Sequence, residues 1–265
     1  MKKRINVLIL SSLLLLVSGL VTASAQQFNV LLFTKTAGWH HSSIHDGVTA
    51  MRKLAARHDF AMQWEENADR VITDDYLKQF DAVVFINTTG DIFNDEQQKV
   101  FERFIQGGKG FVGVHAASDT EYDWPWYGKL VGHYFEIHPA NQTAVLVKQD
   151  NNFPGMKGFD ERHLFTDEFY GFLPANVEGL NYLLTIDEST YDPSADWGAK
   201  KTQGMGEFHP IAWYHEFDGG RSFYTGLGHI PGVYEDDVFL QHLYGGIYWA
   251  ATGKGIESDG AQATK

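Results

Sequence analysis

The residue of this sequence best placed to do chemistry is His115. It follows the apolar residues 110–114 and precedes the small residues 116–118. This pattern predicts a buried parallel strand that ends in a sharp turn, similar to the nucleophile elbow of α/β enzymes. An imidazole at such a turn can serve as a base, an acid or a metal ligand near neutral pH, but it is seldom a nucleophile in hydrolysis. The sequence therefore predicts acid–base or metal chemistry at this turn.

Further polar and aromatic residues follow other predicted strands. Ligands of open parallel sheets bind at the carboxyl ends of the strands, so we expect these residues to converge on His115. The first strand is followed by Trp39, His40 and His41, and the third by Thr88, Thr89 and Asp91. Ser118 and Asp119 follow the His115 turn, and the next segment carries His133 and His138. The last hairpin ends near His229. Most of the 12 His residues lie at strand ends or in loops, and this clustering is the main functional signal.

Each of these residues also has a structural interpretation. His115 could be a buried imidazole that holds the turn, and Asp119 could cap a helix. His133 and His138 are five positions apart, which is not the tight spacing of a His-Glu-x-x-His metal site. Tryptophans such as Trp124 pack a lid more often than they stack on sugars. We interpret four other His residues as structural: His58, His163, His215 and His242.

The first half of the chain alternates between predicted strands and helices. Strands are expected at residues 28–34, 60–65, 82–86 and 110–114. One helix begins after a cap at Ser42 or Ser43, and a second begins with the capping-box pair Asn94 and Gln97 and stops at Gly107-Gly108. Alternation of this kind, with nearly continuous apolar strands, predicts an α/β fold with a doubly wound, mostly parallel sheet.

The pattern loosens after Asp119. Residues 120–142 carry many aromatic residues without clear periodicity, so we predict a loop-rich, aromatic insertion. Further strands are expected at residues 143–147, 180–186, 211–217 and 221–227, with a hairpin turn at 218–220 between the last two. A final helix is expected at residues 237–251.

Composition limits the function further. The formal net charge is −13 and no Lys/Arg run suggesting a nucleic-acid site follows the predicted export signal, which argues against a nucleic-acid partner. The chain has no Cys, which excludes disulfides, thiolate metal sites and Cys nucleophiles. Residues 1–25 have the basic start, apolar core and Ala23-Ser24-Ala25 end of a bacterial export signal, too short for a comfortable membrane anchor. We expect an exported protein, periplasmic or secreted, with one α/β domain at 26–253 and a flexible tail at 254–265.

Several ordered segments resemble the trehalose-utilisation (ThuA-like) family. They are residues 33–44, 113–119, 132–135 with His138-Pro139, 167–170, and 210–229. The resemblance implies a flavodoxin-like fold of the class I glutamine amidotransferase-like superfamily. True amidotransferases carry a Cys at the elbow, whereas this chain has His115 there. Glutaminase activity is therefore excluded on chemical grounds.

The family context points to carbohydrate catabolism, often beside sugar dehydrogenases that make 3-keto-glycosides. A ketone at C3 acidifies the proton on C2, so one base and one electrophile suffice for isomerisation or elimination. We expect His115 to be the base or a metal ligand, His41 and His229 to polarise the carbonyl oxygen, and Asp119 to orient His115. The expected sugar-contacting residues are Trp39, His40, Thr89, Asp91, Trp124, His133, Tyr134, His138 and Arg221.

Two alternatives stay open at this point. One is a non-catalytic periplasmic module that binds sugar, and the other is a metal-dependent hydrolase with Zn²⁺ or a similar ion held by His and carboxylate ligands. The sequence assigns no metal ligand, and it leaves open whether the protein uses a divalent metal ion as a cofactor. The expected partner is a small carbohydrate, without a membrane partner once the signal is removed, and homo-oligomer formation is undecided.

Overall fold

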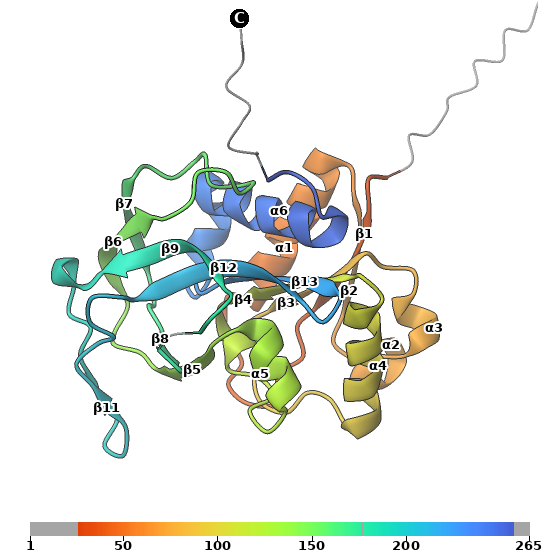
Figure 1. Cartoon of the computed structure of the whole chain (residues 1–265), viewed down its shortest axis with the longest axis horizontal. Coiled ribbons are helices and arrows are strands. Elements are labelled where there is room, and N and C mark those ends of the chain that lie inside the picture. The colour runs from red at the N-terminus through yellow and green to blue at the C-terminus, as the bar shows by residue number, and fades with distance from the viewer. Residues whose placement is uncertain (1–25, 176, 257–265) are drawn as a thin grey trace, which may run out of the picture.

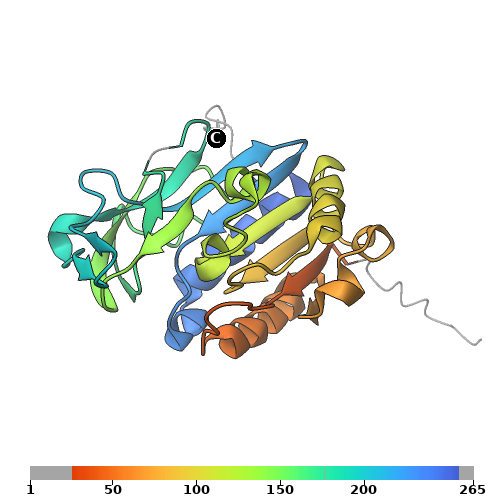
Figure 2. The ribbon, with the colours of Figure 1, turned by 90° about the horizontal axis from the view of Figure 1, so that it is seen from below.

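A nine-stranded mixed sheet runs through the computed structural model, which describes residues 26–175 and 177–256 (Figures 1 and 2). The predicted export signal and most of the predicted tail lie outside these residues. In sheet order the strands are β2 (Ala61–Glu65), β1 (Asn29–Phe33), β3 (Ala82–Ile86), β4 (Gly110–Val114), β13 (Gly220–Thr225), β12 (Pro210–Phe217), β9 (Asn181–Asp187), β6 (Gln142–Lys148) and β7 (Arg162–Asp167). Two small sheets pair β5 (Tyr134–Ile137) with β8 (Gly171–Leu173) and β10 (Ala195–Asp196) with β11 (Lys201–Thr202).

The first five strands in this order are parallel to one another. The sequence predicts this for β1 to β4, whereas the parallel pairing of β13 with β4 is an addition. β3 and β4 are buried along their whole length, because helices cover both faces of this half of the sheet. Figure 1 shows α1 and α6 on one face and α4 and α5 on the other. The helices are α1 (Ile44–His58), α2 (Ala68–Val71), α3 (Asp74–Leu77), α4 (Asp95–Gln106), α5 (Pro125–Val131) and α6 (Asp237–Thr252), with 3-10 turns η1 (His115–Ser118), η2 (Glu188–Thr190) and η3 (Pro231–Glu235). The α/β class is confirmed.

The other half of the sheet is antiparallel. β12 turns back onto β13 through Asp218 and Gly219, both of which have positive φ, as the predicted hairpin requires. β9, β6 and β7 then add in alternating directions, on the opposite side of the molecule from the parallel strands (Figure 2). β7 was not predicted, and it is a sheet-edge strand whose residues alternate between exposure and burial.

Two local predictions need correction. The segment 120–142 contains α5 and β5 rather than loop alone. The sequence does not reveal α5, because a seven-residue helix that starts at a proline is too short to show a periodic pattern. Ser43 occupies the N-cap of α1, but its side chain does not cap the helix. Its hydroxyl instead lies 3.4 Å from the Gly228 carbonyl and accepts a hydrogen bond from Asn87, so it ties α1 to the loop that carries His229. The capping box at Asn94 and Gln97 is confirmed.

No helix within the described ranges combines the length and the apolar character needed to cross a bilayer.

Candidate active site

His115 sits at the sharp turn that the sequence predicts. It follows β4 directly and has a φ of 49°, a left-handed conformation that non-glycine residues rarely adopt. Three contacts hold it there. The Nδ1 atom lies 2.8 Å from the Gly226 carbonyl, Tyr224 donates a hydrogen bond to the His115 carbonyl, and the Tyr170 ring packs on the imidazole at 4.1 Å between centroids. The ring is fully buried, so its Nε2 can act only on groups immediately beside it.

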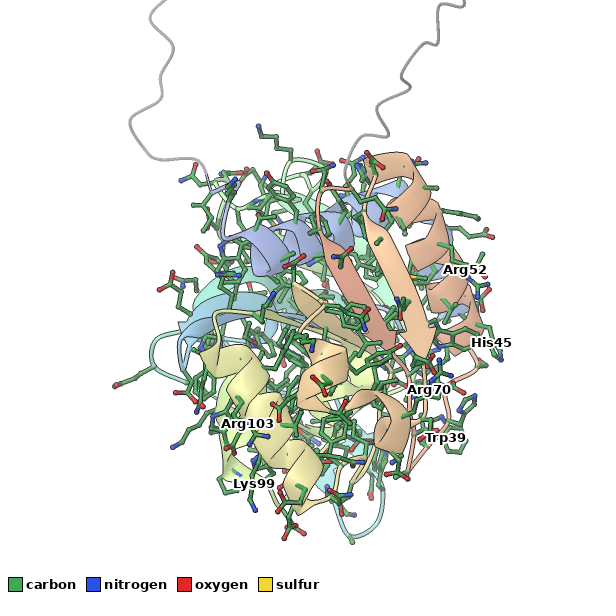
Figure 3. All side chains as sticks on the ribbon, turned by 90° about the vertical axis from the view of Figure 1, so that its right-hand side faces the viewer. Trp39, His45, Arg52, Arg70, Lys99 and Arg103 are labelled. Carbon is green, nitrogen blue, oxygen red and sulfur yellow. The ribbon has the colours of Figure 1, made fainter. Side chains whose placement is uncertain are left out.

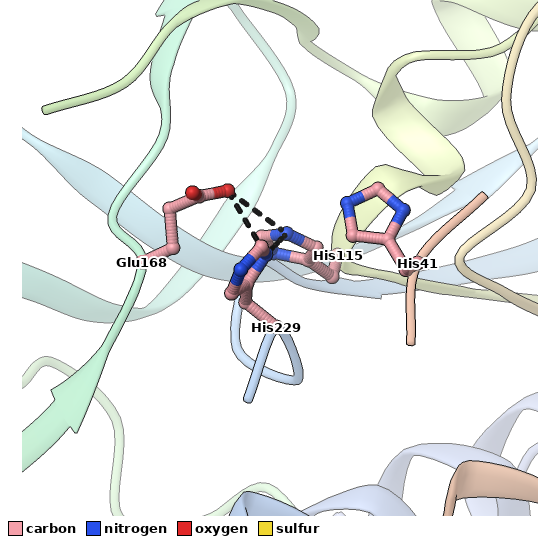
Figure 4. Close-up of side chains that lie close together, drawn as sticks. All are labelled: His41, His115, Glu168 and His229. Carbon is pink, nitrogen blue, oxygen red and sulfur yellow. Dashed lines mark hydrogen bonds and ion pairs between the residues drawn. The ribbon is translucent and has the colours of Figure 1, made fainter. Parts of the chain in front are cut away.

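Two side chains, those of His229 and Glu168, contact that Nε2 atom, and His41 lies beside them (Figure 4). His229 Nδ1 lies 3.1 Å from His115 Nε2, and Glu168 Oε2 lies 3.0 Å from His229 Nδ1 and 3.4 Å from His115 Nε2. His41 presents its ring edge-on to both other imidazoles, at centroid distances of 5.2 and 5.3 Å. One ligand atom from each of the four residues lies within 4.8 Å of the others. We call these four residues the His–Glu cluster.

A buried carboxylate positions the His229 side of the cluster. Asp167, the last residue of β7, accepts hydrogen bonds from the backbone N–H groups of Gly228, His229 and Ile230 at 2.6, 3.1 and 3.1 Å. Burial raises the pKa of Asp167, while the charge of His115 and the backbone hydrogen bonds of Gly228 and Ile230 oppose the rise. Asp167 therefore fixes the loop after β13, and with it the ring of His229.

Burial and mutual charge shift the pKa values in the cluster. Burial first, and then the nearby His115 and His229, lower the pKa of His41 to about 3, so its imidazole is neutral at pH 7. Burial would raise the pKa of Glu168, but its contacts with His115 and His229, which favour the charged carboxylate, outweigh burial and lower the value to about 2. Burial likewise lowers the pKa of His229, but the hydrogen bond and charge of Glu168 reverse the direction and raise it. The cluster thus pairs a carboxylate with an imidazole that holds its proton more tightly than usual.

Three of the four cluster residues, His41, Glu168 and His229, line a cavity of about 510 Å³. Four aromatic side chains and five polar ones line it: Trp39, Phe135, Tyr170, Trp197, His41, Asp119, His138, Glu168 and His229. Trp39 is 72% exposed and projects from the surface near the start of α1 (Figure 3). Aromatic walls with a few convergent polar groups are typical of small-molecule sites, and aromatic faces suit the apolar faces of sugar rings.

His138 is oriented by two oxygen atoms. Its Nδ1 lies 2.8 Å from the Pro139 carbonyl and 3.0 Å from Glu168 Oε1. Both oxygens are acceptors, so we assign the proton to Nδ1, which leaves the lone pair on Nε2. The side chain is 28% exposed and lines the cavity. An imidazole held in this way by a carboxylate has the arrangement of a general base with its orienting group.

The structure brings together His41, Asp119, His138, His229 and Trp39 around the cavity, with His115 beneath them. It does not give Asp119 the expected role, because the Asp119 carboxylate accepts a hydrogen bond from Tyr122 and none from His115. Glu168 takes that place. Burial raises the pKa of Asp119, against the hydrogen bond from Tyr122.

The other expected sugar contacts lie outside the cavity lining. His40 is exposed and lies 3.2 Å from Thr36, Asp91 is exposed, and Thr89 donates a hydrogen bond to the Trp39 carbonyl. The remaining four residues have structural contacts. Trp124 is buried and donates a hydrogen bond to Glu102, and Tyr134 donates one to the Glu121 carbonyl. His133 is buried between Pro174 and Tyr182, and Arg221 binds the Ala250 and Gly108 carbonyls at the start of β13.

Comparison with known proteins assigns the family. A family model described as trehalose utilisation, ThuA, matches residues 29–250. The chain belongs to the ThuA family. A solved structure of a ThuA-like protein from Bacteroides uniformis is 20% identical with a TM-score of 0.70, covering 86% of this chain and 93% of that one. A ThuA-like protein from Parabacteroides merdae is 20% identical with a TM-score of 0.67, covering 87% and 92%.

A β-galactosidase from Bacillus circulans shows a more distant likeness to this ThuA chain. It is 13% identical with a TM-score of 0.52, and the match covers 86% of this chain and 31% of that one. At these identities, the likeness to each of the three solved structures shows the fold alone. No curated protein matches the chain.

Sequence reasoning about this ThuA chain missed Asp167, Glu168, Phe135, Tyr170 and Trp197 as site residues. The first four lie in segments that carry the family resemblance, which was the available signal. Trp197 lies in the turn between β10 and β11 and has no such signal.

Proposed function

We propose that this ThuA protein is a carbohydrate-catabolic enzyme that removes the C2 proton of an oxidised (3-keto) glycoside. One observation carries the proposal: two imidazoles line the same aromatic cavity. His138 is oriented by a carboxylate, and His229 has a raised pKa. His138 is the base, and Glu168 joins it to His229. The family description, trehalose utilisation, supports a sugar substrate.

The proposed reaction starts with transfer of the C2 proton to His138 Nε2. The electrons of the C–H bond form an enolate whose oxygen is the former C3 ketone oxygen, and His229 stabilises it as a hydrogen-bond donor. Return of a proton gives an isomer. Alternatively, the C1–O bond breaks, a C1–C2 double bond forms and the leaving oxygen takes up a proton. Asp119, whose pKa is raised by burial, lines the cavity and is our candidate donor of that proton.

The role of His115 changes in this proposal. Because the ring is fully buried, His115 positions His229 and Glu168 instead of touching the sugar. Trp39, Phe135 and Trp197 hold the sugar rings.

The test is an NMR time course with 3-keto-trehalose in ²H₂O. We expect loss of the C2 proton signal, with release of glucose if elimination follows. His138→Gln should slow exchange by roughly 10²–10⁴-fold, the usual contribution of a general base. His163→Gln, a partly buried His in β7 outside the cavity lining, is the matched control and should exchange at the wild-type rate. Binding of the sugar with neither exchange nor cleavage would overturn the proposal in favour of a sugar-binding module.

A further inference from the structure

We propose that His115, His229 and Glu168, with His41 beside them, bind a divalent transition-metal ion of the Zn²⁺ type. The proposal goes beyond the proposed function, since it stands on the geometry of the cluster and is tested without any sugar.

The spacing of the three closest ligand atoms fits such an ion. Their separations are 3.0, 3.1 and 3.4 Å. Zn²⁺ binds His nitrogen and carboxylate oxygen at about 2.0–2.2 Å, which places neighbouring ligands roughly 2.9–3.5 Å apart in octahedral or tetrahedral geometry. An ion equidistant from the three atoms therefore fits without rearrangement of the backbone.

The distribution of protons points the same way. The Gly226 carbonyl can only accept, so His115 Nδ1 carries the ring proton and Nε2 presents a lone pair. Glu168 Oε2, a carboxylate oxygen, presents lone pairs at 3.4 Å from that Nε2. The one proton that His229 Nδ1 can carry cannot point at both His115 Nε2 and Glu168 Oε2. The contact between His115 Nε2 and Glu168 Oε2 therefore has no proton between its two atoms. A cation between the three atoms satisfies all of them at once.

The groups behind the ligands are those that metal sites use. Ligating His residues commonly donate their second N–H to a backbone carbonyl, as His115 does to Gly226. The second oxygen of Glu168 accepts from His138, and Asp167 holds the His229 backbone. Imidazole ligands favour Zn²⁺ and similar transition metals over Mg²⁺ and Ca²⁺, which prefer oxygen.

His41 and the cavity account for the remaining coordination positions. His41 brings a ligand atom within 4.8 Å of those of the other three residues, and its buried Nδ1 has no hydrogen-bond partner among the described residues. His41, His229 and Glu168 all line the cavity, so the side of the ion away from His115 faces the cavity. A site with three or four protein ligands and an open face is typical of catalytic rather than structural metal ions.

A second His–Glu pair, a buried His209 with a partly buried Glu188, provides the matched control. His209 Nδ1 lies 2.7 Å from Glu188 Oε1, and its other nitrogen lies 2.8 Å from the Tyr170 carbonyl. Glu188 also accepts from the backbone of Met205 and Gly206. Here every polar atom of the pair has a direct partner, and no third side-chain ligand joins it in a metal-binding group among the described residues.

The experiment uses the mature chain without a His tag, stripped with chelator and titrated with Co²⁺ and Zn²⁺ in the absence of sugar. We expect one equivalent to bind, with visible Co²⁺ absorption from nitrogen and oxygen ligands. Glu168→Gln and His229→Gln should each lose more affinity than the roughly 10–100-fold that loss of an outer partner costs. Glu188→Gln should bind as the wild type does, and circular dichroism checks that each variant is folded.

Either of two outcomes would overturn the metal proposal: no ion bound by the folded wild type, or equal affinity in Glu168→Gln and wild type. The sugar experiment separates this result from the proposed function. Metal binding without C2 exchange would support the metal site and contradict the proposed reaction. Exchange by protein that binds no ion would support the reaction and contradict the metal site.

Discussion

Glu168 orients His138: Glu168 Oε1 lies 3.0 Å from His138 Nδ1. The other oxygen of the same carboxylate, Oε2, lies 3.0 Å from His229 Nδ1. One side chain therefore orients two imidazoles that face the same cavity. β5 delivers His138, β7 leads to Glu168 and β13 leads to His229, so three separate elements must be in register for the pair to form.

Glu168→Gln tests the carboxylate as the shared orienting group. The amide keeps the shape but cannot accept from both imidazoles with both of its polar atoms, because one of them is now an N–H₂ group. We expect kcat/KM for a 3-keto-glycoside to fall by roughly 10²-fold or more, similar to the loss in His138→Gln. The double variant should lose little more than either single one, since the two residues act as a unit. Full additivity of the two losses would contradict a shared role.

Asp167→Ala tests the buried support of the His229 loop. The substitution leaves the N–H groups of Gly228, His229 and Ile230 without their acceptor in a buried region. Each unsatisfied group costs about 1–3 kcal/mol, so we expect the free energy of unfolding to drop by at least ~2 kcal/mol in urea titrations. Activity should fall as well, because His229 loses its fixed position. An unchanged urea midpoint would show that the loop does not depend on Asp167.

Substitutions of Trp39 and Trp124 distinguish a residue that contacts the sugar from a residue of the core. Trp39 is 72% exposed at the cavity, so Trp39→Ala should change stability by no more than ~0.5 kcal/mol and mainly raise KM. Trp124 is only 7% exposed and packs on Phe93, Phe101 and Trp126, so Trp124→Ala should cost about 3–5 kcal/mol of stability. The two variants are compared by urea unfolding and by steady-state kinetics. Equal effects on KM would contradict the assignment.

The sequence predicts the parallel half of the fold well because its signals are local. The β4 run before His115 and the Asn94–Gln97 capping box each specify their own structure over a few residues. His41 and His229 could be placed near His115 because each follows a predicted strand. Glu168 could not, because it follows β7, four places from β13 in the sheet, and only tertiary folding returns the chain to the site. Asp119 illustrates the opposite error, since nearness in sequence to His115 does not place its carboxylate against that ring.

His242 makes stability depend on pH independently of the site. It lies fully buried in α6 between Phe159 and Phe223, and neither ring nitrogen has a partner among the described residues. Burial lowers its pKa from 6.5 to about 3, and no charged group contributes to the shift. The folded protein therefore keeps His242 neutral while the unfolded chain takes up a proton. The stability that results is fully present above pH 6.5 and is lost as pH falls from 6.5 towards about 3.

His242→Leu removes this contribution. At pH 7.5 the variant should be as stable as the wild type or more stable, since a buried polar ring without partners is lost. When the pH falls from 7.5 to 5.0, the free energy of unfolding of the wild type should drop by about 2 kcal/mol more than that of the variant. The difference grows by about 1.4 kcal/mol per pH unit below 6.5. His41 and His133, whose pKa values burial also lowers, to about 3 and about 4, stay in both proteins and cancel in the difference. Urea unfolding at the two pH values measures it, with His242→Phe as a second replacement. Parallel pH dependence in all three proteins would show that His242 is not the group that takes up the proton.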